Sequence, residues 1–132
     1  MTTVTMIPFA EGEDRMDWAG LIAALEAGHS QPRAKITDSF LYRDPDTILN
    51  RVAWIDGMGI AVKTATLFPA NPTMDKPTVN GGVSVYSDRD GTLEAVIDFH
   101  LVTKWKTAGD SLLAATKLAR PESRKILIVG AG

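Results

Sequence analysis

A lysine inside a predicted strand is the first residue of this sequence whose type and position could serve chemistry. Residues 59–68 alternate in character, so Ala61, Lys63 and Ala65 are expected to share one strand face lined by small side chains. A lysine on a rigid strand can bind a substrate carboxylate or, once desolvated, exchange a proton near neutral pH. The alternative is a lysine that faces water on a half-exposed sheet. We predict that Lys63 points into a cleft.

A second group of polar residues lies where a helix is expected to begin. The segment 103–111 carries hydroxyl groups together with Lys104 and Lys106. Helix N-termini attract anions through free amides and the macrodipole, so this segment is compatible with a phosphate or carboxylate site. It is equally compatible with a capped amphipathic helix whose lysines are solvated, which Asp110 favours.

A Gly-x-Gly sequence follows the last apolar run. Residues 125–129 predict a short strand of the kind buried in a parallel sheet, and Gly130 and Gly132 come directly after it. A strand followed by Gly-x-Gly is how a dinucleotide-binding fold begins, because the glycines allow backbone amides to approach a pyrophosphate. The alternative is an ordinary strand with a flexible glycine tail, since the further small residue and the acidic residue of the motif are not part of the sequence.

Other site chemistries find no support in the residue pattern. Neither His29 nor His100 has metal-ligand spacing, so we interpret both as structural or surface residues and expect no metal. The absence of cysteine excludes a disulfide framework and a thiolate site. No nucleophile elbow is visible, so covalent hydrolase chemistry is not expected.

Composition limits the class of protein. Hydrophobic residues make up 45% of the 132 residues, which predicts a folded domain, and a net charge of -2 offers no wide basic surface for nucleic acid. The apolar runs are far shorter than the roughly 20 residues of a membrane-spanning helix. The N-terminus lacks the basic start and apolar stretch of a signal peptide. We expect a cytoplasmic protein with neither a nucleic-acid nor a membrane partner.

Periodicity and turn residues predict an α+β domain up to about residue 120. The expected elements are a helix over 14–27, a hairpin of strands 34–42 and 48–55, a strand over 59–68, a loop over 69–78, a hairpin of strands 83–86 and 93–99, and a helix over 103–118. The polar stretch 120–124 separates this domain from the strand over 125–129.

Taken in order, five of these motifs resemble the ornithine cyclodeaminase/mu-crystallin family. They are Gly59–Lys63, Phe68–Asn71, the hairpin over 91–98, the segment 103–111, and Gly130–Gly132. The resemblance implies a two-domain α/β enzyme. Residues 1–120 would be its α+β substrate-binding and dimerisation domain, and residues 125–132 the first strand and Gly-x-Gly of a truncated Rossmann domain.

The resemblance also implies site residues. Lys63 matches the substrate-site lysine, with a catalytic role, and Arg33 the arginine that binds the substrate carboxylate; Arg43 or Arg51 takes that role if the register of the first two strands shifts. Lys106 stands where the family has arginine, so a single ammonium replaces a planar fork of donors. The residues expected to contact NAD or NADP are Thr78, Lys106, Thr107, Gly130 and Gly132.

Two local sequences, Trp105–Ala108 and Ala53–Ile55, are similar to the branch of delta-1-pyrroline-2-carboxylate reductases. The expected enzyme is then a homodimer that reduces a cyclic imino acid to proline or a homologue. Ornithine cyclodeamination, a non-catalytic ligand-binding or dimerisation module, and a cofactor-free α+β ligand-binding domain are the alternatives. The family's catalytic aspartate is expected beyond residue 132, so we expect the 132-residue chain alone to be inactive.

Overall fold

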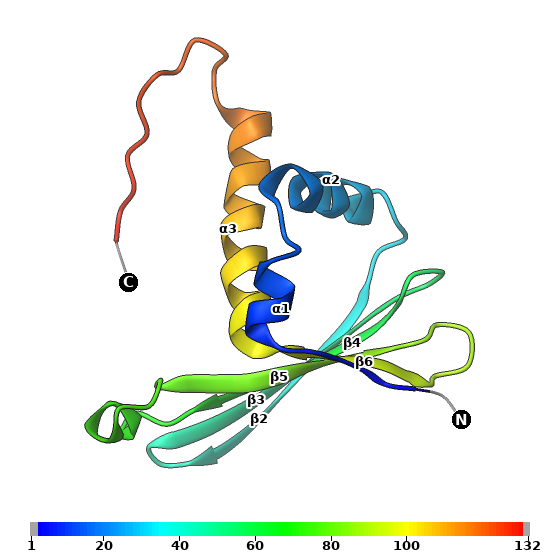
Figure 1. Cartoon of the computed structure of the whole chain (residues 1–132), viewed down its shortest axis with the longest axis vertical. Helices are drawn as coiled ribbons and strands as arrows, with labels where there is room; N and C mark the ends of the chain where they lie inside the picture. Colours follow the sequence, from blue (N-terminus) through cyan, green and yellow to red (C-terminus); the bar gives the residue numbers. More distant parts are fainter. Residues whose placement is uncertain (1–2, 131–132) are drawn as a thin grey trace.

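Six strands form one mixed sheet in the order β1-β6-β5-β4-β3-β2 in the computed structural model, which describes residues 3–130 (Figure 1). β1 pairs with β6 in parallel, and the other neighbours are antiparallel. The strands are β1 (Thr5–Ile7), β2 (Lys35–Arg43), β3 (Asp46–Ile55), β4 (Gly59–Leu67), β5 (Val79–Tyr86) and β6 (Leu93–Asp98). The helices are α1 (Phe9–Glu13), α2 (Trp18–His29) and α3 (Phe99–Leu118), with a 3₁₀ turn η1 (Asn71–Met74).

The two predicted hairpins and the strand between them are confirmed. β2 and β3 are joined across the turn that follows Arg43, and β4 runs over nearly the expected range. In the second hairpin, which joins β5 and β6, Gly91 has a φ of +70°, as its Asp-Gly sequence predicts. The mixed sheet with helices agrees with the expected α+β class.

The helix boundaries differ from the sequence prediction. The first predicted helix, expected over 14–27, is α2, which begins after the N-cap Asp17 and continues to His29. The second predicted helix, α3, begins at Phe99 rather than Thr103, because the Asp98 carboxylate accepts a hydrogen bond from the Leu101 amide at 2.9 Å. Neither β1 nor α1 was predicted.

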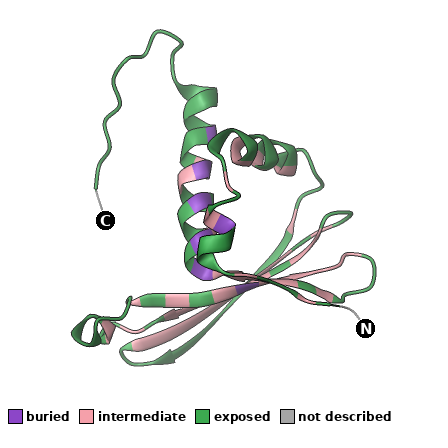
Figure 2. Cartoon of the chain, in the orientation of Figure 1, coloured by how far each residue is buried: buried purple, intermediate pink, exposed green. Residues whose placement is uncertain are grey.

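The core lies where α3 meets the sheet. α3 rises from the sheet at β5 and β6, and its buried residues follow the side of the helix that faces α1 and α2 (Figure 2). Gly81 makes this approach possible, since a Cβ atom there would lie 2.7 Å from the ring of Phe99 and 1.9 Å from the Thr64 carbonyl oxygen. The buried hydrophobic residues of the described chain are Val83, Phe99, Leu101, Trp105 and Leu113.

α1 and α2 pack against α3. The Trp18 and Trp105 rings lie 4.1 Å apart between centroids, and Gly109 lets the Leu21 side chain approach the α3 backbone. The Glu13 carboxylate accepts a hydrogen bond from Trp105 Nε1 at 2.6 Å and forms an ion pair with Lys104 of α3. The Trp105 indole is thus buried with its polar atom satisfied.

Residues 120–130 form no helix or strand. Ile126, Leu127, Ile128 and Val129 are each at least 79% exposed, and Gly130 has a φ of +93°. The Rossmann strand over 125–129 and the boundary at 120–124 therefore stay predictions, and Gly132 lies outside the described residues. Among residues 3–130, no helix has the length and apolar character required to cross a membrane.

We predict that Gly81→Ala destabilises the fold by about 1 to 3 kcal/mol, because the new methyl group overlaps the β4 backbone and the Phe99 ring. Urea unfolding followed by circular dichroism measures the effect. Gly82→Ala is the matched control, since a Cβ at that neighbouring position meets no atom within 4 Å. Equal urea midpoints of unfolding for the two variants would contradict the close packing of Phe99 and β4 on Gly81.

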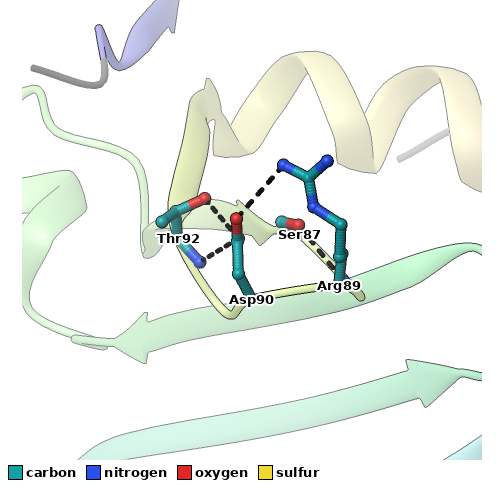
Figure 3. Close-up of polar contacts among 4 residues, drawn as sticks. All are labelled: Ser87, Arg89, Asp90 and Thr92. Atoms are coloured by element: carbon teal, nitrogen blue, oxygen red, sulfur yellow. Dashed lines mark hydrogen bonds and ion pairs between the residues drawn. The ribbon is translucent and has the colours of Figure 1, made fainter.

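We also predict a pH-dependent contribution from Asp90 in the β5–β6 turn. Its carboxylate accepts hydrogen bonds from the Thr92 hydroxyl at 2.8 Å and the Thr92 amide at 3.2 Å, and it lies 3.3 Å from the Arg89 guanidinium (Figure 3). The Thr92 hydrogen bonds lower the pKa of Asp90 from 3.8 to about 2. Because the folded pKa is depressed, this stabilisation is complete above pH of about 4 and is lost as the pH falls through about 2.

The test compares the parent chain with Asp90→Asn. We expect the parent to be the more stable at neutral pH and the difference to shrink between pH 4 and pH 2, while NMR titration of the Asp90 carboxyl carbon gives a midpoint near 2. A difference in stability that does not depend on pH in that window would show that the carboxylate charge contributes nothing.

Candidate functional site

Lys63 lies at the centre of β4, opposite Arg51 of β3 and Val83 of β5. Its side chain lies on the face of the sheet that carries the helices. The side chains of Ala61 and Ala65 lie on the same face, so the prediction that these three residues share one face is confirmed. Lys63 is half-buried, and its Nζ lies 5.8 Å from the centroid of the Phe99 ring. An ammonium at this distance from an aromatic face is attracted by the ring quadrupole. The lysine is therefore held near the point where α3 leaves the sheet.

The carboxylate of Asp38 and the guanidinium of Arg51 lie in line with Lys63 on the two strands next to β4. Asp38 of β2 lies opposite Arg51, which lies opposite Lys63, so that the three side chains form one row across the sheet. Arg51 donates two hydrogen bonds to Asp38, from Nε at 2.7 Å and from an Nη at 2.6 Å. We refer to these residues as the Asp38–Arg51–Lys63 row.

The charges of the row influence one another. The hydrogen bonds from Arg51 lower the pKa of Asp38, and the positive charges of Arg51 and Lys63 lower it further, against a smaller opposing effect of burial. In return, the bonds to Asp38 raise the pKa of Arg51. Both shifts favour the ionised forms of Asp38 and Arg51, and with the lysine the formal net charge of the row is one positive unit.

Small and apolar residues flank the row on both sides. One neighbouring row of the sheet consists of Ile36, Ala53, Ala61 and Val85, and the other of Phe40, Leu49, Ala65 and Gly81. A single net positive charge between two apolar rows suits a small carboxylic acid with an apolar ring or chain.

The arginines expected at the site are in different places. Arg33 lies in exposed coil before β2, five positions from Asp38, or about 16 Å along an extended chain. Arg43 closes the β2–β3 turn on the opposite face, pairs with Asp46 at 2.5 Å and lies over the Phe68 ring. Arg51 is the arginine beside Lys63, so the alternative of a shifted register fits the geometry better than Arg33, whose role stays a prediction.

Thr78 precedes β5 in a segment held by two amide side chains. Asn71 and Asn80 both donate hydrogen bonds to the Pro77 carbonyl, at 2.9 and 2.8 Å, and the Thr78 carbonyl accepts one from the Phe68 amide at 2.8 Å. The half-buried Thr78 is therefore fixed in orientation at the end of the 69–78 loop.

Lys106 and Thr107 lie on the exposed surface of α3, and Lys106 pairs with Asp110 at 2.6 Å. Because α3 begins at Phe99, residues 103–111 are inside the helix, so the expected helix start at Thr103 is wrong and the free amides of the helix N-terminus lie before this segment. An anion site over 103–111 stays a prediction. The two side chains offer an ammonium and a hydroxyl, as suits phosphate or ribose oxygens. Among residues 3–130, no hydrogen bond or ion pair joins them to Thr78.

A hollow of about 360 Å³ lies among α1, α2, α3 and the sheet. Lys106 borders it and Lys63 does not, so the prediction that Lys63 points into a cleft stays a prediction. Its lining is otherwise apolar except for Arg15: Ile7, Gly12, Met16, Leu21, Ile97, Leu101, Val102 and Trp105. Its lining residues include no carboxylate and no imidazole.

The histidines take structural places. The His100 ring lies edge-on to Phe99, with Nε2 3.4 Å from Asn80 Oδ1, and His29 ends α2. Within residues 3–130, no group of three or more histidine, aspartate or glutamate side chains is arranged to hold a metal ion.

Trp54, part of the Ala53–Ile55 sequence, has a structural role here. Its Nε1 donates a hydrogen bond to Asp88 at 2.6 Å, and Asp88 also accepts one from the Gly57 amide at 2.8 Å. The bond from Trp54, followed by that from Gly57, lowers the pKa of Asp88. This carboxylate ties the β3–β4 turn to the β5–β6 turn at the end of the sheet remote from η1.

Sequence reasoning missed Asp38, although a signal was present. Counting outward from the pair Arg43 and Asp46, which closes the first hairpin, places Asp38 directly opposite Arg51. Opposite charges directly across a pair of strands are a stabilising arrangement and could have been recognised in the sequence.

The family model described as the ornithine cyclodeaminase/mu-crystallin family matches residues 52–132. The delta(1)-pyrroline-2-carboxylate reductase of Paracoccus denitrificans is 44% identical over 126 residues, which cover 96% of this chain and 40% of that protein. The chain thus spans about two fifths of the length of this relative.

Two solved structures share the fold. A Thermococcus litoralis delta(1)-pyrroline-2-carboxylate reductase in complex with NADH and L-proline has a TM-score of 0.76 at 21% identity, over 92% of this chain and 40% of that one. The iminosuccinate reductase of Paracoccus denitrificans in complex with NAD+ has a TM-score of 0.78 at 14% identity, with the same coverage.

Proposed function

The chain belongs to the ornithine cyclodeaminase/mu-crystallin family, and we propose that it is the substrate-binding portion of an NAD(P)-dependent reductase of cyclic 2-imino acids. Delta-1-pyrroline-2-carboxylate is the first candidate substrate and proline the product. The observation that carries this proposal is the Asp38–Arg51–Lys63 row, with one net positive charge between apolar rows. The 44% identity to a reductase of that substrate over 96% of the chain supports it.

Lys63 has the role of binding the substrate carboxylate. Among residues 3–130 no carboxylate lies within 4 Å of its ammonium, whereas Arg51 is already paired. The substrate ring would then lie against the small side chains of Ala61 and Ala65, with its imine carbon open to hydride attack. Reduction adds hydride to that carbon and a proton to the nitrogen, so that a saturated cyclic amino acid results.

The proposed cofactor, NAD or NADP, supplies the hydride when it is bound. Thr78, Lys106 and Thr107 fit the edge of such a site, because hydroxyl groups and an ammonium donate hydrogen bonds to phosphate and ribose oxygens. The ion pair between Lys106 and Asp110 has to open or share its charge with the phosphate. Gly130 and Gly132 belong to the same proposal as the start of the dinucleotide-binding domain over 125–132, with residues 1–120 as the substrate-binding domain.

The proposal includes a homodimer formed through the edge strand β2. β2 is an edge strand and carries large apolar side chains that are exposed: Ile36, Phe40, Leu41 and Tyr42. Such a strand with unpaired backbone groups favours association with a second copy.

Ornithine cyclodeaminase activity is the second candidate, favoured by the family to which the chain belongs. It uses the same carboxylate contact but requires a site for a second, distal ammonium group. The third candidate is a module that binds a ligand or dimerises without catalysis.

We predict that Lys63→Ala in the full-length polypeptide lowers kcat/KM for delta-1-pyrroline-2-carboxylate by about ten- to a hundredfold, because one charge-assisted bond to the carboxylate is lost. Thermal unfolding should change little, since Lys63 is only half-buried. Lys35→Ala is the matched control, a strand lysine on the opposite face that pairs with Asp56 at 3.6 Å. Unchanged kcat/KM in Lys63→Ala would exclude the carboxylate role.

Turnover of two substrates separates the candidate functions. We expect the full-length polypeptide to reduce delta-1-pyrroline-2-carboxylate with NADH or NADPH and to release no ammonia from ornithine. Absorbance at the nicotinamide band and an ammonia assay measure the two reactions. Ammonia release at a comparable rate would assign cyclodeaminase instead, and turnover of neither substrate would leave the non-catalytic module.

A further inference from the structure

We propose that Asp38 determines the charge of the acids that this site accepts, by occupying Arg51 and so restricting the site to monocarboxylates. The inference rests on the proposed function, because it takes the substrate carboxylate to bind at Lys63. Asp38 is then a specificity-determining residue that acts through its neighbour rather than by contact with the reacting atoms.

The geometry makes Asp38 the partner of Arg51. The two hydrogen bonds of 2.7 and 2.6 Å engage Nε and one Nη, the edge of the guanidinium that also fits a substrate carboxylate. The Asp38 side chain is 29% exposed and that of Arg51 is 51% exposed, so both face the same open surface as Lys63. A ligand that reaches Lys63 therefore lies next to both groups.

The net charge of the Asp38–Arg51–Lys63 row then favours the binding of monocarboxylates over dicarboxylates. A monocarboxylate at Lys63 neutralises the net charge of one. A second carboxylate on the ligand would find the Nε edge of Arg51 occupied and the Arg51 charge already balanced by Asp38, and it would lie close to the Asp38 charge. Repulsion between like charges is an effective means of rejecting one ligand in favour of another.

A purely structural ion pair is the competing explanation. The chain contains a matched pair for comparison, because Arg43 and Asp46 join the same two strands at 2.5 Å on the opposite face. If Asp38 only stabilises the hairpin, Asp38→Asn and Asp46→Asn should both affect stability and leave the choice of substrate unchanged.

The test measures the ratio of kcat/KM for delta-1-pyrroline-2-carboxylate to that for iminosuccinate, a dicarboxylate imine formed from oxaloacetate and ammonia. We expect Asp38→Asn to lower this ratio by about fivefold or more, which is the scale of one partly screened charge. Asp38→Glu should retain most of the parent ratio, the double variant Asp38→Asn/Arg51→Gln should recover it, and Asp46→Asn should leave it unchanged.

An unchanged ratio in a folded Asp38→Asn protein, or an equal change in Asp46→Asn, would overturn the inference. If Asp38→Asn does not fold, Arg51→Gln decides: an unpaired Asp38 beside Lys63 should lower kcat/KM for the monocarboxylate, and an unchanged value would reject the role of Asp38.

A binding measurement separates this inference from the proposed function. If the parent protein turns over neither imine, the proposed function fails, and NMR titration of the Lys63 Nζ signal with pyrrole-2-carboxylate and with succinate replaces the kinetic ratio. Stronger binding of succinate relative to pyrrole-2-carboxylate in Asp38→Asn supports the charge selection by Asp38. Equal relative binding in the parent and the variant overturns it.

Discussion

The contact between the Phe99 ring and the bare backbone at Gly81 is the constraint on which the rest of this structure depends. It lets α3 begin directly on the sheet, where the side chain of Asp98 caps the helix. From that start, Trp105 reaches α1 through Glu13 and α2 through Trp18. The same ring lies 5.8 Å from the ammonium of Lys63, so the packing that closes the core also sets the surroundings of the candidate site.

The sheet supplies the other half of the site through its register. Antiparallel pairing places residues of three strands in one row, and a slip by one position would turn every member of the row to the other face. The ion pair between Asp38 and Arg51 and the position of Lys63 therefore depend on a single registration of β2, β3 and β4. The apolar rows on either side resist such a slip, because it would exchange apolar for polar side chains.

Relatives with this fold are named for different substrates at low identity. The two solved structures share the arrangement of elements at 21% and 14% identity, so the fold alone does not choose a substrate. In this chain, the Asp38–Arg51–Lys63 row carries one uncompensated positive charge, on the side of the sheet where α3 begins.

The amino-acid sequence by itself determined the hairpins, β4 and the face shared by Ala61, Lys63 and Ala65, because alternation and turn residues act over short distances. It also predicted the amphipathic α2 and most of α3. The start of α3 combines a local cap, Asp98, with the packing of Phe99 on Gly81, and only the tertiary structure supplies that packing. β1 and α1 are each too short to be stable alone and find partners only in the folded chain. The choice of Arg51 over Arg33 beside Lys63 likewise came from strand register, which joins residues distant in the chain through backbone pairing.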